Sequence, residues 1–231
     1  MGFKEKAHKF LTNPKKVKTS AIIGVFSLIF ALVVGIVIAQ FDPDGYNIFE
    51  NYISDLGSFD HTPFPYLWDA GQMICACSMI PAAFYLQKLF STYSDKEEAR
   101  KESSKPRLFL SYLCFISVCI SLLGMLMAGL FSEDRTTALN LHMVASYIDF
   151  GGLALTSLFF GLSITFYPSP VPRPLGIFMM LVPPIASGIF FTTFNIFSEW
   201  LLMFSLMVWL LPFAIILLKQ LNKEIASRSP I

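Results

Sequence analysis

Three polar side chains on one apolar segment have the types and the spacing to act together. His142, Ser146 and Asp149 are four and three residues apart, so on a helix they form a single polar column. An imidazole that is oriented by a carboxylate can serve as the general base for a hydroxyl nucleophile. A separate stretch supplies such a hydroxyl at Ser54. Ser54 is therefore the candidate nucleophile, with His142 as the base. The orienting carboxylate would be Asp149, Asp69 or Asp55.

The stretch from 47 to 61 is dense in reactive side chains, and further polar residues follow it. Asp69 and Gln72 are three residues apart and share one helical face. If this face and the column at His142 both point inward, they define one cavity below the stretch. The residues that we expect to bind a ligand, or to form a structural polar cluster, are Asp55, His61, Asp69, Gln72 and Ser146.

Structural roles explain many of the same residues without any chemistry. Asp69 and His142 can cap the starts of helices, and Asp149 can form a hydrogen bond between helices, as polar side chains do in membranes. The run from Ser54 to Gly57 can be a capped helix end. Asp55 would then pin the loop to the second or the fourth helix.

Metal binding is a further alternative. His61, His142 and two of the Asp residues could surround a metal ion with one open position. The chain has no His-Glu-x-x-His motif or comparable spacing, so we assign no metal site. The four Cys lie in apolar blocks, where buried thiols behave as small apolar side chains. No cofactor is indicated.

Composition identifies the elements that must position these residues. The chain has 231 residues, of which 55% are hydrophobic and only 14% are charged, whereas soluble domains carry about 25% charged residues. The apolar residues come in blocks of about 20, the length that spans a bilayer. We predict an all-α, polytopic membrane protein, a single membrane domain over 1–231 with six helices in a bundle. The predicted helices span about 21–40, 67–90, 108–131, 138–166, 175–194 and 199–221, with a charged link at 95–105.

The distribution of basic residues predicts the orientation of this bundle. Six helices place both termini on one side, and sixteen of the seventeen Lys and Arg residues fall on that side. Because cytoplasmic segments are enriched in Lys and Arg, we expect both termini to be cytoplasmic and the protein to lie in the cell membrane. Arg135 and the loop 42–66 would then be extracytoplasmic. The acids that we expect to be solvated there are Asp42, Asp44, Glu133 and Asp134.

Local signals refine this scheme. Asn47 and Glu50 have the spacing of a capping box, and apolar residues after them share a face, so we predict a short interfacial helix over about 48–56. Pro81 predicts a kink in the second helix. Asp149 would lie about 10–16 Å below the outer end of its helix. A carboxylate at that depth costs roughly 2.5–3.5 kcal/mol, so we expect it to face the bundle interior.

One motif resembles a known family. The run Asn51-Tyr-Ile-Ser-Asp-Leu-Gly57, directly after a first membrane helix, is similar to the signature of a large prokaryotic family of six-helix membrane proteins, the domain-of-unknown-function family 998. The resemblance covers nearly the whole chain and implies the fold and the importance of 51–57, without an activity to carry over. A looser similarity, to six-helix lipid hydrolases of the androgen-induced type, makes Ser54 and His142 counterparts by position.

Three classes of function follow from these residues. The first, which we favour, is a lipid-binding or partner-binding membrane protein with an outward-facing polar cavity. The second is an intramembrane lipid hydrolase or transferase that uses Ser54 and His142. The third is a small transporter, since a buried acid such as Asp149 and a proline pair such as Pro183-Pro184 are typical of transporters. Nucleic-acid binding is not expected, because the basic residues flank membrane spans. The expected partners are the bilayer and a lipid ligand.

Overall fold

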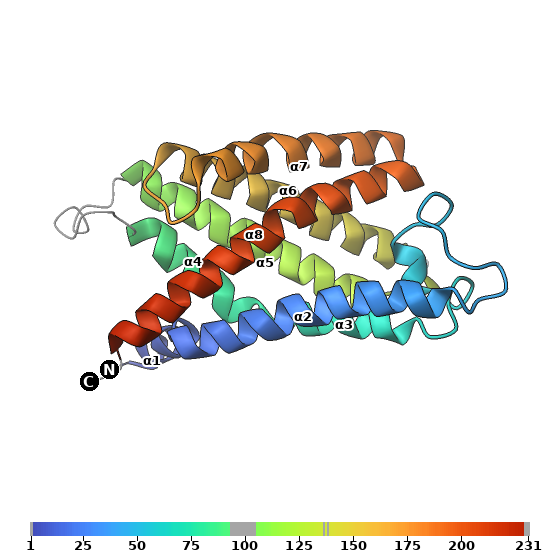
Figure 1. Ribbon diagram of the computed structural model, residues 1–231, viewed down its shortest axis with the longest axis horizontal. Coiled ribbons are helices and arrows are strands. Elements are labelled where there is room, and N and C mark those ends of the chain that lie inside the picture. The colour runs from blue at the N-terminus through green and yellow to red at the C-terminus, as the bar shows by residue number, and fades with distance from the viewer. Residues whose placement is uncertain (1, 93–104, 136, 138, 229–231) are drawn as a thin grey trace.

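The computed structural model describes residues 2–92, 105–135, 137 and 139–228. Every regular element in these residues is helical. The long helices extend along one common direction, and the first helix lies at the same end of the bundle as the last turns of the final helix (Figure 1). This end is named the terminal end. The opposite end, which includes residues 40–65, 131–135 and 194–195, is named the loop end.

Five helices are long and apolar enough to cross a membrane. They are α2 (Pro14–Ala39), α5 (Lys105–Leu130), α6 (Leu141–Phe166), α7 (Arg173–Thr193) and α8 (Ile196–Arg228). Two shorter helices, α3 (Tyr66–Ser78) and α4 (Ile80–Thr92), are bent relative to one another and together also meet this criterion. If the pair is counted as one span, it is the sixth. The prediction of an all-α, polytopic membrane protein is thereby confirmed.

The helix predicted over 67–90 is present as two shorter helices, and the bend predicted at Pro81 takes the form of a break between them. The chain breaks at Met79, and α3 and α4 are bent by 41° relative to one another. Pro81 is the second residue of α4. It has no amide hydrogen for the carbonyl of Cys77, and its ring would collide with that carbonyl, so α3 does not continue through it. Both halves nevertheless pack against α2 and α5.

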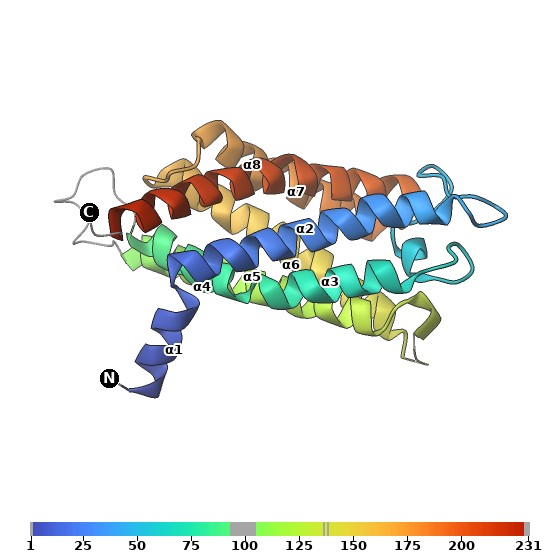
Figure 2. The same cartoon turned by 60° about the horizontal axis from the view of Figure 1, so that its bottom comes forward.

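Other boundaries also differ from the prediction. The first span begins at Pro14 rather than 21, because Asn13 caps it and accepts the Lys15 N–H at 3.0 Å. Before it lies α1 (Phe3–Leu11), a helix that was not predicted and that projects away from the bundle (Figure 2). The last span is longer than 199–221 at both ends. Most of the predicted link at 95–105 lies outside the described residues.

The interfacial helix predicted over 48–56 is not formed. Only the 3₁₀ turn η1 (Ser54–Gly57) is present. The Asn47 side chain accepts the Phe49 N–H at 3.0 Å, so it closes a local turn instead of capping a helix. The Tyr52 N–H donates to the Asp55 carboxylate at 2.9 Å, which removes a donor that a helix would use.

Glycines bring α5 and α6 close together, and this pair makes the most extensive contact in the bundle. A Cβ at Gly124 would lie 2.3 Å from the backbone nitrogen of Asp149, and one at Gly152 would lie 2.6 Å from that of Ser121. Small residues permit such approaches between membrane helices. α7 packs on α6 and α8, at the side of the bundle.

Candidate functional site

The bundle contains a cavity of about 430 Å³. Its walls come from α2, α3, α4, α5, α6 and α8, and η1 adds Ser54. In the described part of the chain, α7 contributes no residue to the lining. The proline pair Pro183-Pro184, which suggested a transporter, therefore lies away from this cavity, in a helix that continues through both prolines.

Polar side chains line the part of the cavity nearest the loop end. They come from η1 and from the parts of four helices that lie towards that end. These residues are Ser54, Gln72, Ser121, His142, Ser146, Asp149 and Glu199. The column on α6 thus faces the interior, and it shares one cavity with Gln72 of α3 and with Ser54.

Asp149 is 8% exposed and lies against α5. Its Oδ1 accepts a hydrogen bond from the Ser121 hydroxyl at 2.8 Å. The close approach at Gly124 and Gly152 places the two helices near enough for this bond. In the described residues Oδ2 has no hydrogen-bond partner, so one carboxylate oxygen is available on the cavity wall.

His142 and Ser54 line the same cavity but are held differently. The Nδ1 of His142 lies 2.8 Å from the carbonyl oxygen of Phe131. Because a carbonyl only accepts, Nδ1 donates and Nε2 of the neutral ring is an acceptor. The Ser54 hydroxyl makes no hydrogen bond within the described residues. The hydrogen bond that would activate Ser54 as a nucleophile is thus not formed in this structure.

Asp55 and His61 belong to the loop rather than to the cavity lining. The Asp55 carboxylate accepts from the Tyr52 N–H at 2.9 Å and from the Asn51 side chain at 3.2 Å. His61 Nε2 lies 3.9 Å from the same carboxylate. Asp55 therefore organises its own loop. Among the described residues, its hydrogen bonds reach neither the second nor the fourth predicted membrane helix, so they do not support the prediction that Asp55 pins the loop to one of them.

Asp69 also lies outside the cavity lining, unlike Gln72. Its carboxylate binds Arg135 of η3 (Glu133–Arg135), and this guanidinium also donates to the Gly129 carbonyl at 3.0 Å. Asp134, which was expected to be solvated, accepts from the Ser58 hydroxyl at 2.8 Å and from the Phe59 N–H at 2.7 Å. These contacts join the segment that follows α5 to α3 and to the loop that precedes α3.

Sequence reasoning missed the residues of α8 that hold the loop. The Ile53 N–H donates to Glu199 Oε2 at 2.7 Å, and the Trp200 indole donates to the Asn51 carbonyl at 2.9 Å. The adjacent acid and tryptophan at the start of an apolar helix were the available signal. Their partners lie 146 and 149 residues away in the chain, so spacing could not reveal them.

The metal alternative finds no support in this arrangement. Among the described residues, no group of three or more His, Cys, Asp or Glu side chains is placed to hold a metal ion. His61 lies beside Asp55 in the loop, whereas His142 lines the cavity.

Comparison with known proteins identifies the family. The family model described as protein of unknown function (DUF998) matches residues 25–216, which is most of the chain and includes every membrane span in whole or in part. The chain belongs to the DUF998 family. The region shared with DUF998 contains all the polar cavity residues named above. No curated protein and no solved structure matches the chain significantly.

Proposed function

We propose that this protein binds a membrane amphiphile in its interior cavity. The observation that carries the proposal is the chemical division of the cavity wall. Polar side chains gather towards the loop end, whereas the lining towards the terminal end is apolar apart from two side chains. These are Thr156, whose hydroxyl is already bonded to Ser117 at 3.2 Å, and Trp209, whose indole N–H has no hydrogen-bond partner among the described residues. A lipid with a polar head and a hydrocarbon chain matches this division.

The size and the borders of the cavity fit such a ligand. A volume of about 430 Å³ lies within the range of small-molecule sites. Three lining residues are also exposed on the surface of the bundle: Ile22 and Phe26 of α2 and Leu211 of α8. The wall between these helices is therefore the natural entry for a lipid from the bilayer.

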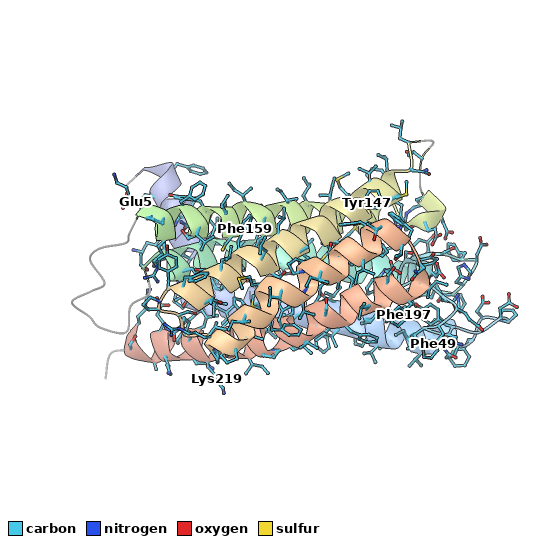
Figure 3. All side chains as sticks on the ribbon, turned by 90° about the horizontal axis from the view of Figure 1, so that it is seen from above. Glu5, Phe49, Tyr147, Phe159, Phe197 and Lys219 are labelled. Carbon is cyan, nitrogen blue, oxygen red and sulfur yellow. The ribbon has the colours of Figure 1, made fainter. Side chains whose placement is uncertain are left out.

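The same proposal includes an orientation. The loop end faces outward and the terminal end faces the cytoplasm, because the basic residues gather at the terminal end. Phe49 and Phe197 are exposed at the loop end, and Lys219 lies towards the other end (Figure 3). Aromatic residues at the membrane–water interface and a lysine at the cytoplasmic end are consistent with this placement.

A second candidate is hydrolysis of a lipid ester by Ser54 with His142 as the base. It is favoured by the fact that both residues line the cavity and that Nδ1 of His142 is held by the Phe131 carbonyl. Binding accounts for the arrangement better, because Ser54 lacks the required hydrogen bond. If the reconstituted protein releases fatty acid from a lipid ester and Ser54→Ala abolishes this release, the proposed function is hydrolysis rather than binding alone.

The binding proposal is tested by filling the cavity. Ala214 lines it, whereas the next residue, Ile215, is exposed and does not. We expect the wild-type protein to retain a lipid in native mass spectrometry after extraction in detergent. Ala214→Phe should lose this lipid, and the matched control Ile215→Phe should keep it.

Two results would contradict the proposal. One is a wild-type protein that carries no lipid even with excess lipid extract. The other is Ala214→Phe retaining lipid as well as Ile215→Phe does, which would place the bound lipid on the outside of the bundle.

A further inference from the structure

The polar end of the cavity has two carboxylic acids and, among the described lining residues, no cation to match them. Asp149 and Glu199 both line it and are 8% and 5% exposed. In the described residues that form the lining there is no Lys or Arg. Arg135, the basic residue nearest in the chain to this end of α6, is bound to Asp69 outside the lining. A buried carboxylate is expensive unless a partner compensates it.

Among the described residues, neither carboxylate uses both of its oxygen atoms. Asp149 Oδ1 accepts from Ser121, and Glu199 Oε2 accepts from Ile53. Within the described part of the chain, the second oxygen of each makes no hydrogen bond. The protein thus orients both carboxylates and leaves one acceptor on each.

Gln72 provides an independent indication that a ligand binds here. It lines the cavity from α3 and is only 7% exposed. Its side-chain amide has no hydrogen bond to any described residue. Because this amide lies on the cavity wall and has no partner among the described residues, it can bond to a ligand there. Its carbonyl oxygen adds a third acceptor to the two carboxylate oxygens.

We propose that the amphiphile carries a cationic amine head, which binds Asp149 with help from Gln72, while Glu199 attracts it from nearer the loop end. A primary ammonium has three N–H donors and no acceptor, so it complements a wall that offers free acceptor oxygens. A phosphate or carboxylate head would instead meet two acids with no Lys or Arg on the wall. This inference rests on the binding function proposed above and specifies its ligand class.

The experiment compares three probes with the same sixteen-carbon chain: a primary alkylamine, an alkanol and an alkanoate. Binding to the purified wild-type protein is measured by competition in native mass spectrometry. We expect the amine to bind about tenfold or more tightly than the alkanol, because it compensates a buried charge, and the alkanoate to bind most weakly.

Isosteric variants separate charge from shape. Asp149→Asn keeps an oxygen for Ser121 and removes the charge, so it should lower affinity for the amine about tenfold or more and leave affinity for the alkanol unchanged. Glu199→Gln should have the same effect to a smaller degree. The control is Ser157→Ala, a buried residue of α6 outside the cavity lining, which should change neither affinity.

The outcomes distinguish the inferred amine head from the proposal that the cavity binds a lipid. If the alkanol or the alkanoate binds as tightly as the amine, or if Asp149→Asn weakens all three probes equally, the amine head is wrong and the cavity remains a lipid site. If none of the three binds to the wild-type protein, both proposals fail. The comparison among probes on the wild-type protein requires no variant to fold.

Discussion

Tyr46 shows how a single residue holds the loop at the end of the bundle. It is 6% exposed, and its hydroxyl donates to the Tyr52 carbonyl at 2.8 Å. Burial, followed by the charges of Asp55 and Glu199, raises the pKa of this phenol above its ordinary value. The hydroxyl therefore remains protonated and remains a donor in the folded loop.

The buried hydroxyl of Tyr46 predicts how the stability of a variant without it depends on pH. Tyr46→Phe should lower the free energy of unfolding by about 1 kcal/mol near neutral pH, the usual value of one hydrogen bond. Because the folded protein raises the pKa of Tyr46, this contribution is complete below the ordinary tyrosine pKa of 10.0 and declines as the pH rises above it. The difference in free energy of unfolding between the wild-type protein and Tyr46→Phe should therefore become smaller at alkaline pH.

Thermal unfolding in detergent, followed for both proteins from about pH 8 to pH 11, measures this difference. Comparing the two proteins at each pH removes the effects of the lysines and of the other tyrosines, which both contain. A difference in stability that stays constant across this range would contradict the predicted role of Tyr46.

At the scale of elements, the contact between α5 and α6 supports the polar column. Gly124 and Gly152 bring the two backbones together, and the Ser121 hydroxyl then reaches Asp149. Gly151 and Gly152 are adjacent on α6. The structure divides the pair, since only Gly152 faces α5, whereas a Cβ at Gly151 would meet a single atom of Phe191 at 4.0 Å.

This division predicts opposite effects for two adjacent substitutions. Gly152→Ala should destabilise the bundle by about 1–3 kcal/mol, because its methyl group would collide with the Ser121 backbone and force α5 away. Gly151→Ala should be neutral or stabilising by up to about 1 kcal/mol, because alanine restricts the unfolded chain and meets no obstacle. Thermal unfolding of the two variants in the same detergent measures both. Equal effects would show that α5 and α6 do not pack in this way.

At the scale of the whole molecule, the charge distribution sets the expected orientation. Asp44 is exposed at the loop end, and Lys223 is exposed in the last turns of α8. The four native Cys lie within α3 and α5. A membrane-impermeant maleimide can therefore report which end of the bundle faces the medium.

In intact cells, Asp44→Cys should react with this reagent, whereas Lys223→Cys should react only after the membrane is permeabilised. The native chain is the control for labelling of its own four Cys. The reverse pattern would invert the orientation and would place the polar end of the cavity towards the cytoplasm.

The fold class could be predicted because its signals are local in the sequence. Apolar blocks of bilayer length produce the spans, and the spacing of His142, Ser146 and Asp149 fixes their common face on α6 whatever surrounds it. The break near Pro81 has a local cause too. The loop helix over 48–56 failed because side chains such as Asn47 and Asp55 bonded the nearby backbone more favourably than a helix would.

Only the tertiary structure decided which polar residues share the cavity. Asp69 and Gln72 are three residues apart and are therefore expected on one face of α3. Arg135 nevertheless holds Asp69 outside the lining of the cavity, whereas Gln72 lies on it. Glu199 binds Ile53 across 146 residues. Contacts of this range depend on how the helices pack, and packing depends on the shapes of all the facing side chains together, which no periodicity in the sequence records.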